Sequence, residues 1–378
     1  MTGSKNQALK IALVHDYIKE YGGAERVLET LCEIYPEAPV YTAFYSPEFL
    51  GPHRDRFEKF NIRTTWFQNF PFKNKLLSYF RLFAPFVFKS IDLSEFDLVI
   101  ASATGTYTGP NFVKLGPKTK LICYCHTPPR YLYGYATAAP WKSVWWRKLL
   151  YVFGQVPIHF LRLQDFKSAQ RPDYFIANSK EVAKRIKKFY RRDPTIIYPP
   201  VKIKNFSPEE KRGEYYLAGG RLARPKHIDL AVLVCTKLSL PLKIFGREFS
   251  GYGSQLHAVA GHTIEFLGEI NEDKKWELYK SAKAFLFPSE DEDFGIMPVE
   301  AMAAGTPVIA YNSGGVRETV VNGKTGLYFD ELNAESLAEA IKKFEKMSFD
   351  PKDCIEQAHK FSRERFKKEI SEFVRSKS

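Results

Sequence analysis

Two glutamates, Glu292 and Glu300, stand eight residues apart in an acidic run that begins at Pro288. The apolar run 284–287 predicts a buried strand that ends at this proline, and 295–304 is typical of the helix that follows. The carboxyl end of a strand is where ligands bind in open α/β sheets. Because a carboxylate accepts two hydrogen bonds, Glu292 on the loop suits sugar hydroxyls, and Glu300, one to two turns into the helix, suits a ribose diol.

A basic loop follows the first apolar run of the second half of the chain, 215–218. Arg221, Arg224 and Lys226 lie within six residues there. A departing diphosphate needs cations at the oxygens where negative charge develops, and an arginine fork with a lysine point charge meets that need. The alternative is a solvated basic loop, but the position at a strand end favours ligand binding.

The acidic run also contains an Asp-x-Asp sequence, Asp291 and Asp293. In other enzymes such a pair holds a divalent cation through hard oxygens. Here Arg221 and Lys226 would already neutralise the phosphates, and a solvated acidic turn is the commoner fate of such runs. We therefore expect no metal and no other cofactor.

Three more loops follow predicted strands. Gly22 and Gly23 open the first helix, where their N–H groups could approach a phosphate. His126 precedes two prolines that would form a rigid turn, although a lone histidine after a strand is more often structural. Gly314 and Gly315 could again bring N–H groups to a ligand. Ligand-capable loops in both halves predict one cleft between two lobes.

Short apolar runs alternate with helical patterns in both halves, which predicts an α/β fold with two similar, doubly wound parallel sheets. Consecutive prolines at 199–200 stop a helix and stiffen a connector. The predicted domains are 1–198 and 199–355, and a last helical segment, 356–378, is expected to pack across the lobes or back onto the first. The predicted strands are 11–14, 40–45, 96–101, 120–124, 174–177, 215–218, 242–245, 264–267, 284–287 and 307–310; the predicted helices include 24–35, 228–238, 271–281 and 336–347.

The composition, 44% hydrophobic and 26% charged over 378 residues, is that of a soluble two-domain enzyme. The sequence has no stretch of eighteen uncharged apolar residues and no apolar signal core at its N-terminus. Its five cysteines are an odd number without Cys-x-x-Cys spacing, as expected for free thiols in a reducing compartment rather than for a zinc site. These features predict a cytoplasmic protein.

The formal net charge of +13 attracts polyanions. Nucleic acid is the weakest candidate, because no basic recognition motif is present. An anionic membrane surface is better supported, since 69–90 interleaves aromatic with basic residues and 141–153 adds three tryptophans, as interfacial segments do. Core helices with snorkelling lysines are the alternative. We expect a protein that binds peripherally at the inner face of the membrane.

Taken in order, these motifs resemble those of the retaining GT-B glycosyltransferases of family 4, from residue 11 to about 330. The Glu-x7-Glu motif of Glu292 and Glu300 is specific in this context, whereas Gly-Gly is not. The resemblance implies two Rossmann-like domains facing a central cleft, with a nucleotide-diphosphate sugar held mainly by the C-terminal lobe and the acceptor held mainly by the N-terminal one. The matching stretches are 22–26, 126–131, 220–226, 292–308, 313–318 and 322–327.

The resemblance also implies individual roles. Arg221 and Lys226 would bind the diphosphate, Glu300 the ribose, and Glu292 the donor sugar. His126 would sit beside the hydroxyls of that sugar. The predicted catalytic residues are His126, Arg221, Lys226 and Glu292; the predicted donor-binding residues are Gly22, Gly23, Arg221, Lys226, Glu292, Phe294, Gly295, Ile296 and Glu300; the predicted acceptor-binding residues are Asp16 and Arg130.

Two runs, 126–131 and 221–229, resemble the bacterial mannosyltransferases of surface polysaccharide assembly. GDP-mannose is therefore the expected donor, and a lipid-linked sugar or oligosaccharide the expected acceptor. Family members keep the anomeric configuration without a metal. Ala223 and Arg224 depart from the family pattern before Lys226. A UDP- or ADP-sugar transferase or a nucleotide-sugar epimerase on the same fold, and a non-catalytic assembly partner, are the alternatives.

Overall fold

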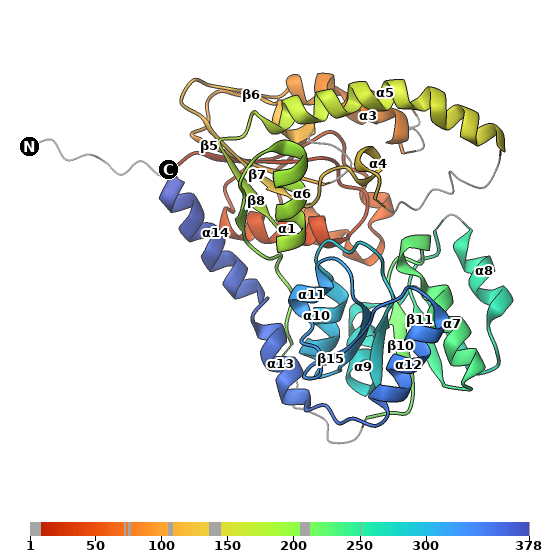
Figure 1. The fold of residues 1–378 in the computed structure, drawn as a ribbon. Coiled ribbons are helices and arrows are strands. Elements are labelled where there is room, and N and C mark those ends of the chain that lie inside the picture. Colours follow the sequence, from red (N-terminus) through yellow and green to blue (C-terminus); the bar gives the residue numbers. More distant parts are fainter. Residues whose placement is uncertain are drawn as a thin grey trace, which may run out of the picture. The chain divides into compact units, whose positions relative to one another are not determined.

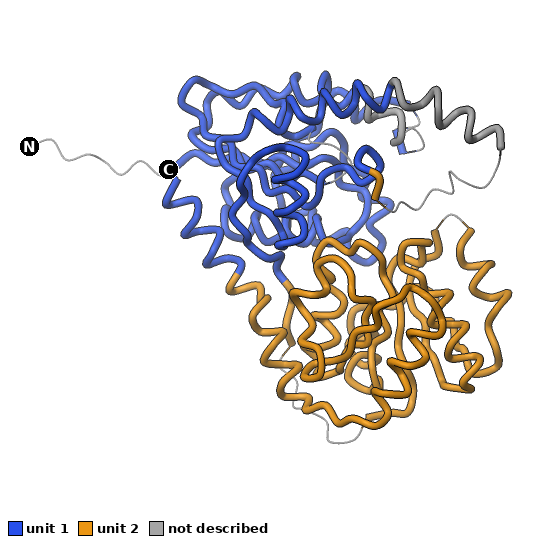
Figure 2. Tube along the Cα trace, viewed as in Figure 1, with its two compact units in different colours: residues 1–133, 149–200, 366–378 blue, residues 134–148, 201–365 orange. Residues whose placement is uncertain are grey.

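A computed structural model describes residues 9–71, 73–74, 77–104, 109–135, 145–204, 212–249 and 251–377, and the side-chain surroundings within these ranges except at 77–82 and 145–156. The chain divides into two compact units, which Figure 2 colours separately. Unit 1 comprises Met1–Tyr133, Leu149–Pro200 and Phe366–Ser378, and unit 2 comprises Gly134–Lys148 and Val201–Arg365. The main passage of the chain from unit 1 to unit 2 falls between Pro200 and Val201, directly after the double proline of the predicted connector.

The main sheet of unit 1 has seven strands in the order β3-β2-β1-β5-β7-β8-β9, and all neighbours are parallel (Figure 1). A small two-stranded sheet pairs β4 with β6. The strands are β1 (Ile11–His15), β2 (Val40–Thr42), β3 (Ile62–Thr64), β4 (Asp92–Leu93), β5 (Leu98–Ala103), β6 (Lys114–Leu115), β7 (Lys120–Cys125), β8 (Tyr174–Ala177) and β9 (Thr195–Ile196).

Both faces of this sheet are buried. Leu13 of β1 belongs to a core formed with α1 (Gly23–Ile34) and α14 (Arg363–Lys377), whereas Ala12 and Val14 belong to a second core formed with α3 (Leu77–Lys89). Such strands have continuous apolar runs, because neither face meets water. The helices that lie wholly or largely in unit 1 are α1 (Gly23–Ile34), α2 (Asp55–Glu58), α3 (Leu77–Lys89), α4 (Arg130–Tyr133), α5 (Trp145–Ala169), α6 (Lys180–Tyr190) and α14 (Arg363–Lys377), with 3-10 turns η1 (Pro47–Phe49), η2 (Gly51–His53), η3 (Trp66–Asn69) and η4 (Gly109–Phe112).

The sheet of unit 2 has six parallel strands in the order β12-β11-β10-β13-β14-β15. Its strands are β10 (Tyr216–Gly219), β11 (Leu242–Phe245), β12 (Ile264–Gly268), β13 (Ala284–Phe287), β14 (Val308–Tyr311) and β15 (Gly326–Phe329). Its helices are α7 (Ile228–Lys237), α8 (Tyr252–Val259), α9 (Glu272–Ser281), α10 (Ile296–Ala303), α11 (Val316–Thr319), α12 (Ala334–Phe344) and α13 (Pro351–His359), with the 3-10 turn η5 (Arg224–Lys226).

In both sheets the strand order reverses beside the first strand of the unit. The reversal lies between β1 and β5 in unit 1 and between β10 and β13 in unit 2. Ligands of doubly wound proteins bind outside the carboxyl ends of the strands at such a switch point. The predicted α/β fold with two doubly wound parallel sheets is confirmed.

The C-terminal helix α14 has a narrow apolar stripe on an otherwise polar sequence. Phe366, Ile370 and Val374 recur at helical spacing and lie in the core that also contains Leu13 and α1. The ring of Phe366 meets Tyr124 of β7 edge-on, with centroids 5.9 Å apart. The polar helix is therefore part of unit 1. The helix before it, α13, lies in unit 2, so the segment predicted to start at 356 begins inside a helix.

No helix within the described ranges combines the length and the apolar character that a membrane crossing requires.

Candidate functional site

At the switch point of unit 2, the loops after β10 and β13 are tied together. The Glu290 N–H donates to the carbonyl of Pro225 over 2.9 Å. The Lys226 ammonium donates to Oε2 of Glu292, and the Ser289 hydroxyl donates to the same oxygen over 3.0 Å. The predicted basic and acidic loops thus meet at one place, where parallel sheets bind ligands.

Lys226 and Glu292 therefore contact each other. The side chain of Lys226 is 25% exposed and that of Glu292 is 19% exposed, so both charges remain accessible to a ligand. The sequence predicts separate partners for them, a diphosphate for Lys226 and a sugar for Glu292. In this structure each charge serves as the partner of the other, and a bound phosphate would compete with the carboxylate for the ammonium.

The loop of Glu292 is held by two glycines after β14. The Gly315 N–H donates to the carbonyl of Glu292 over 2.7 Å. Gly314 has φ +63°, and a Cβ there would lie 2.2 Å from the same carbonyl oxygen. The prediction that both glycines offer N–H groups to a ligand is therefore wrong for Gly315, whose N–H is bonded within the protein. These glycines allow one backbone to approach the other closely.

The residues after Glu292 begin helix α10. Gly295 has φ +91° and precedes Ile296, the first helical residue. Phe294 is buried, and its ring packs against Phe361 with centroids 5.3 Å apart. Phe294 and Gly295 are buried, and Ile296 is partly exposed. Because its ring is buried, Phe294 can act on a ligand only through its backbone.

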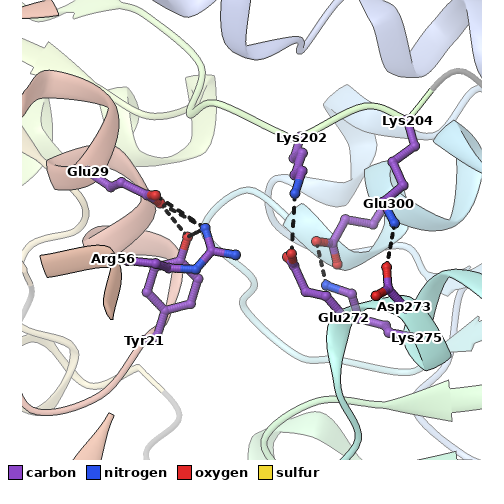
Figure 3. A network of polar contacts seen from close by, with 9 residues as sticks. All are labelled: Tyr21, Glu29, Arg56, Lys202, Lys204, Glu272, Asp273, Lys275 and Glu300. Atoms are coloured by element: carbon purple, nitrogen blue, oxygen red, sulfur yellow. Dashed lines mark hydrogen bonds and ion pairs between the residues drawn. The ribbon is translucent and has the colours of Figure 1, made fainter. Parts of the chain in front are cut away.

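Glu300 lies one turn further along α10 and is paired with a lysine that the sequence analysis missed. Its side chain is 2% exposed, and Oε1 accepts a hydrogen bond of 2.9 Å from Lys275 of α9, which is 12% exposed. The Tyr279 hydroxyl lies 3.5 Å from Oε2. Figure 3 shows the Lys275 ammonium directed at the carboxylate. This pair fixes the carboxylate that is predicted to hold a ribose.

Arg221 does not share the enclosed position of Lys226. It is exposed, and its guanidinium carbon lies 5.8 Å from the centre of the Phe249 ring. An exposed guanidinium over an aromatic ring gains a modest cation–π energy, about 0.5–1 kcal/mol. Its predicted contact with a diphosphate stays a prediction.

At the switch point of unit 1, three side chains from neighbouring strands form a hydrogen-bonded row. The Ser102 hydroxyl at the end of β5 lies 3.0 Å from Nδ1 of His15 and 2.9 Å from Nε2 of His126. The Asn178 amide donates to the carbonyl of His126 over 2.8 Å. A hydroxyl donates one hydrogen bond and accepts another, so Ser102 can link the two rings.

His126 is held neutral by its surroundings. Its residue is 8% exposed. Burial, with a smaller contribution from nearby His15, lowers the pKa of His126 to about 3. At pH 7 its ring can therefore accept or donate a hydrogen bond but carries no charge. Arg130, the predicted acceptor contact, follows as the first residue of α4 and is partly exposed.

Asp16 lies beside this row and is fully buried. Oδ2 accepts hydrogen bonds of 2.6 Å from the Thr104 N–H and 2.7 Å from the Thr104 hydroxyl. Oδ1 has no hydrogen-bonding partner among the described residues. Burial raises the pKa of Asp16 to about 7, although His15 and the bonds from Thr104 oppose the shift. The predicted acceptor residue is thus a carboxyl group that changes charge near neutral pH.

The Asp16→Asn variant should remove this titration. Because the pKa of Asp16 is raised from 3.8 to about 7 on folding, the folded state binds more protons between these pH values. The free energy of unfolding of the wild type should fall across that window, and the stability of Asp16→Asn relative to the wild type should rise by about 3 kcal/mol between pH 4.5 and 7. Urea denaturation at pH 4.5 and 7 measures it. Asp97→Asn, at an exposed aspartate of unit 1, is the control; parallel profiles for Asp16→Asn and wild type would contradict the assignment.

The turn before α1 bonds to its own helix. The Gly22 N–H donates to Oε2 of Glu25 over 2.8 Å, so this predicted phosphate donor is already engaged. Gly23 is the first residue of α1. Beside the turn, the Tyr21 hydroxyl donates to Glu29 over 2.6 Å, and Arg56 pairs with that carboxylate at 3.2 Å (Figure 3).

The residues that hold the predicted ones are not predictable from a sequence motif. They come from other elements and lack a motif: His15, Ser102, Thr104, Lys275 and Ser289. His15 and Ser102 could have been found from their positions at strand ends. Lys275 gives no local signal, because only the packing of α9 against α10 brings it to Glu300. Within the described residues, no group of three His, Cys, Asp or Glu is placed to hold a metal ion.

Two family models match the chain in consecutive segments. The model described as Glycosyltransferase Family 4 matches residues 21–205, and the model described as Glycosyl transferases group 1 matches residues 201–361. The chain belongs to the family 4 glycosyltransferases. The first segment contains strands β2 to β9 of unit 1, and the second contains all six strands of the sheet of unit 2.

Known mannosyltransferases are among the relatives of this family 4 glycosyltransferase. The α-1,3/1,6-mannosyltransferase of Homo sapiens is 25% identical over 291 residues, which cover 66% of this chain and 65% of the relative. The O-antigen chain mannosyltransferase of Salmonella typhimurium is 30% identical over 189 residues, 48% of this chain and 53% of the relative. The chain thus matches between half and two thirds of the length of these curated relatives.

Solved structures confirm the GT-B fold. An Anabaena protein, HepE, determined in complex with UDP and glucose, superposes with a TM-score of 0.72 at 19% identity. The match covers 98% of this chain and 100% of HepE. At this identity the likeness shows the fold, two Rossmann-like domains, and nothing finer.

Proposed function

We propose that this family 4 glycosyltransferase moves a hexose, mannose from GDP-mannose, onto a lipid-linked or oligosaccharide acceptor, with retention of the anomeric configuration and without a metal. The observation that carries the proposal is in unit 2. Lys226 and Glu292 meet at the strand ends beside the switch point, and Glu300 lies in the helix α10 that follows the loop of Glu292. This part of unit 2 supplies a cation for phosphate and two carboxylates for hydroxyl groups.

The chemistry would depend on orientation and on charge. When a nucleotide sugar departs as a diphosphate, negative charge builds on the phosphate oxygens, and the Lys226 ammonium can stabilise it. Glu292, released from Lys226, can accept hydrogen bonds from the sugar. Retaining glycosidases use two carboxyl groups about 5 Å apart. Here the carboxylates are assigned to binding, and the leaving phosphate is the proposed acceptor of the proton in a front-face attack.

Mannose is proposed as the sugar because both named relatives are mannosyltransferases. A second candidate, a UDP-sugar transferase, is favoured by HepE, which was solved with UDP and glucose. Surface polysaccharide synthesis is the proposed process, since the Salmonella relative acts on the O-antigen chain. In that process the protein would work at the cytoplasmic face of a membrane.

A thermal-shift panel tests the donor. GDP, UDP, ADP and their sugar conjugates are added with a chelator present throughout. A ligand at 100 times its Kd stabilises the fold by about 2.7 kcal/mol, which is enough to rank the bases. A shift with GDP-mannose under chelator is the expected result. A shift with UDP conjugates alone would move the proposal to the second candidate, and no shift with any nucleotide would favour a non-catalytic assembly partner.

A further inference from the structure

The helices α3 and α5 of unit 1 present large apolar side chains to solvent. On α3, Phe83 is 55% and Phe86 is 65% exposed; on α5, Phe160 is 64% and Leu163 is 46% exposed. Each pair has i,i+3 spacing, which places its two members on one side of a helix. These four side chains define the α3–α5 surface.

The two helices are neighbours. Figure 1 shows α3 and α5 running next to each other, and one pocket of unit 1 is lined by Ala84 and Pro85 of α3 together with Leu161 and Asp165 of α5. The residues that line the pocket adjoin the exposed ones in sequence. The exposed pairs therefore lie on two neighbouring helices of unit 1, and exposed apolar side chains on neighbouring elements mark an interaction surface.

The charge of these helices indicates the partner. Among the residues whose side chains are described, α3 carries one basic residue, Lys89, and no acidic one, and α5 carries two, Arg162 and Lys167, and one acidic residue. The one acidic residue, Asp165, is 6% exposed and accepts a hydrogen bond of 2.7 Å from the Tyr133 hydroxyl. Its charge is therefore withdrawn from the surface, while Lys89 and Lys167 at the helix ends are exposed.

We propose that the α3–α5 surface docks this protein on an anionic lipid bilayer. Its aromatic and aliphatic side chains would enter the interfacial region, and the lysines would face the lipid headgroups. The proposal rests on the proposed function for its purpose, since a lipid-linked acceptor stays in the membrane. It goes beyond the aromatic-basic pattern of 69–90, because it adds Phe160 and Leu163, which lie in neither of the two segments predicted from the sequence.

Vesicle flotation of the full-length protein tests the proposal. The probes are vesicles of phosphatidylcholine alone and of phosphatidylcholine with 30% phosphatidylglycerol. We expect flotation with the anionic vesicles at low salt, weaker flotation at 0.5 M NaCl, and little with the neutral vesicles. In the variant Phe86→Ser/Phe160→Ser, partitioning should fall at least about tenfold. Both phenylalanines are mostly exposed, so the fold should survive.

Two exposed apolar residues of unit 2 give the matched control. Leu233 of α7 and Phe249 are each 45% exposed, and Leu233→Ser/Phe249→Ser should float like the wild type. Absence of wild-type flotation, or equal losses in both variants, would overturn the proposal. Light scattering gives a second test. If the wild type were a dimer, and Phe86→Ser/Phe160→Ser made it monomeric without changing flotation, the α3–α5 surface would bind a second copy of this chain, and the proposal would be overturned.

The thermal shift with nucleotides separates the two proposals. The variant Phe86→Ser/Phe160→Ser should keep the nucleotide shift of the wild type while it loses flotation. Flotation without any nucleotide shift in the wild type would contradict the proposed function and leave the docking surface standing.

Discussion

The Lys226→Ala variant is expected to turn over substrate at least about tenfold more slowly than the wild type, a loss of ~1.4 kcal/mol of transition-state stabilisation. The Lys226 ammonium pairs with Glu292 at the strand ends of unit 2. An interaction that strengthens as the diphosphate departs lowers kcat, whereas one of equal strength in the ground state raises KM alone. Initial rates over a range of nucleotide-sugar concentrations distinguish the two effects.

The control for this variant is Lys243→Ala. Lys243 lies on β11 of the same sheet and pairs with the exposed Glu265 at 3.1 Å, so its removal should change turnover little. Unchanged turnover in Lys226→Ala would remove this lysine from the proposed chemistry. Equal losses in both variants would indicate a general effect on unit 2 rather than a local one.

The Glu292→Gln variant distinguishes the role of Glu292 from that of Lys226. With the carboxylate neutralised, the ammonium of Lys226 no longer has a competing anion, so a nucleoside diphosphate should bind at least as tightly as in the wild type. Turnover should still fall, because the amide is a poorer acceptor for sugar hydroxyls than a carboxylate. Isothermal titration with the diphosphate and a rate assay give the two readouts. Weaker diphosphate binding would contradict the competition between Glu292 and phosphate.

The central strands of both sheets could be predicted from the sequence because they are buried on two faces. A continuous apolar run such as 98–103 in β5 predicts a strand that is buried on both faces. The edge strands β3 and β15 were missed. Ile62–Thr64 of β3 is short and partly exposed, and Gly326 begins β15 where a Cβ would lie 1.9 Å from the carbonyl of Val308. A glycine required by close backbone approach looks like a loop residue in the sequence.

The candidate site was predicted by residue type and position, not by contact. Strand ends located His126, Lys226 and Glu292, because parallel strands bring their carboxyl ends to one edge, whereas Asp16 was named only from the family resemblance. The sequence could not show that Lys226 pairs with Glu292, since 66 residues separate them. Each such contact depends on which loops the sheet order places side by side, and that order is a tertiary property.

The Lys275→Met variant should strongly destabilise the fold. Glu300 is 2% exposed and Lys275 12%, so removing the ammonium leaves a buried carboxylate without its ionic partner (Figure 3). Breaking a buried pair from one side costs about 3–5 kcal/mol. Methionine keeps the length and apolar stem of lysine, which limits the loss from packing. Urea denaturation measures the free energy of unfolding.

Lys274→Met is the matched control, one residue earlier on α9. Lys274 pairs with Glu277 at 3.0 Å, but their side chains are 55% and 66% exposed, so the loss should stay within about 1 kcal/mol. In Lys275→Met/Glu300→Gln no unpaired charge remains, and part of the stability should return. Equal effects of Lys274→Met and Lys275→Met would contradict the buried pair. If Glu300 also holds the ribose, Lys275→Met should reduce the thermal shift by every nucleotide, since the lysine fixes the carboxylate rather than selecting a base.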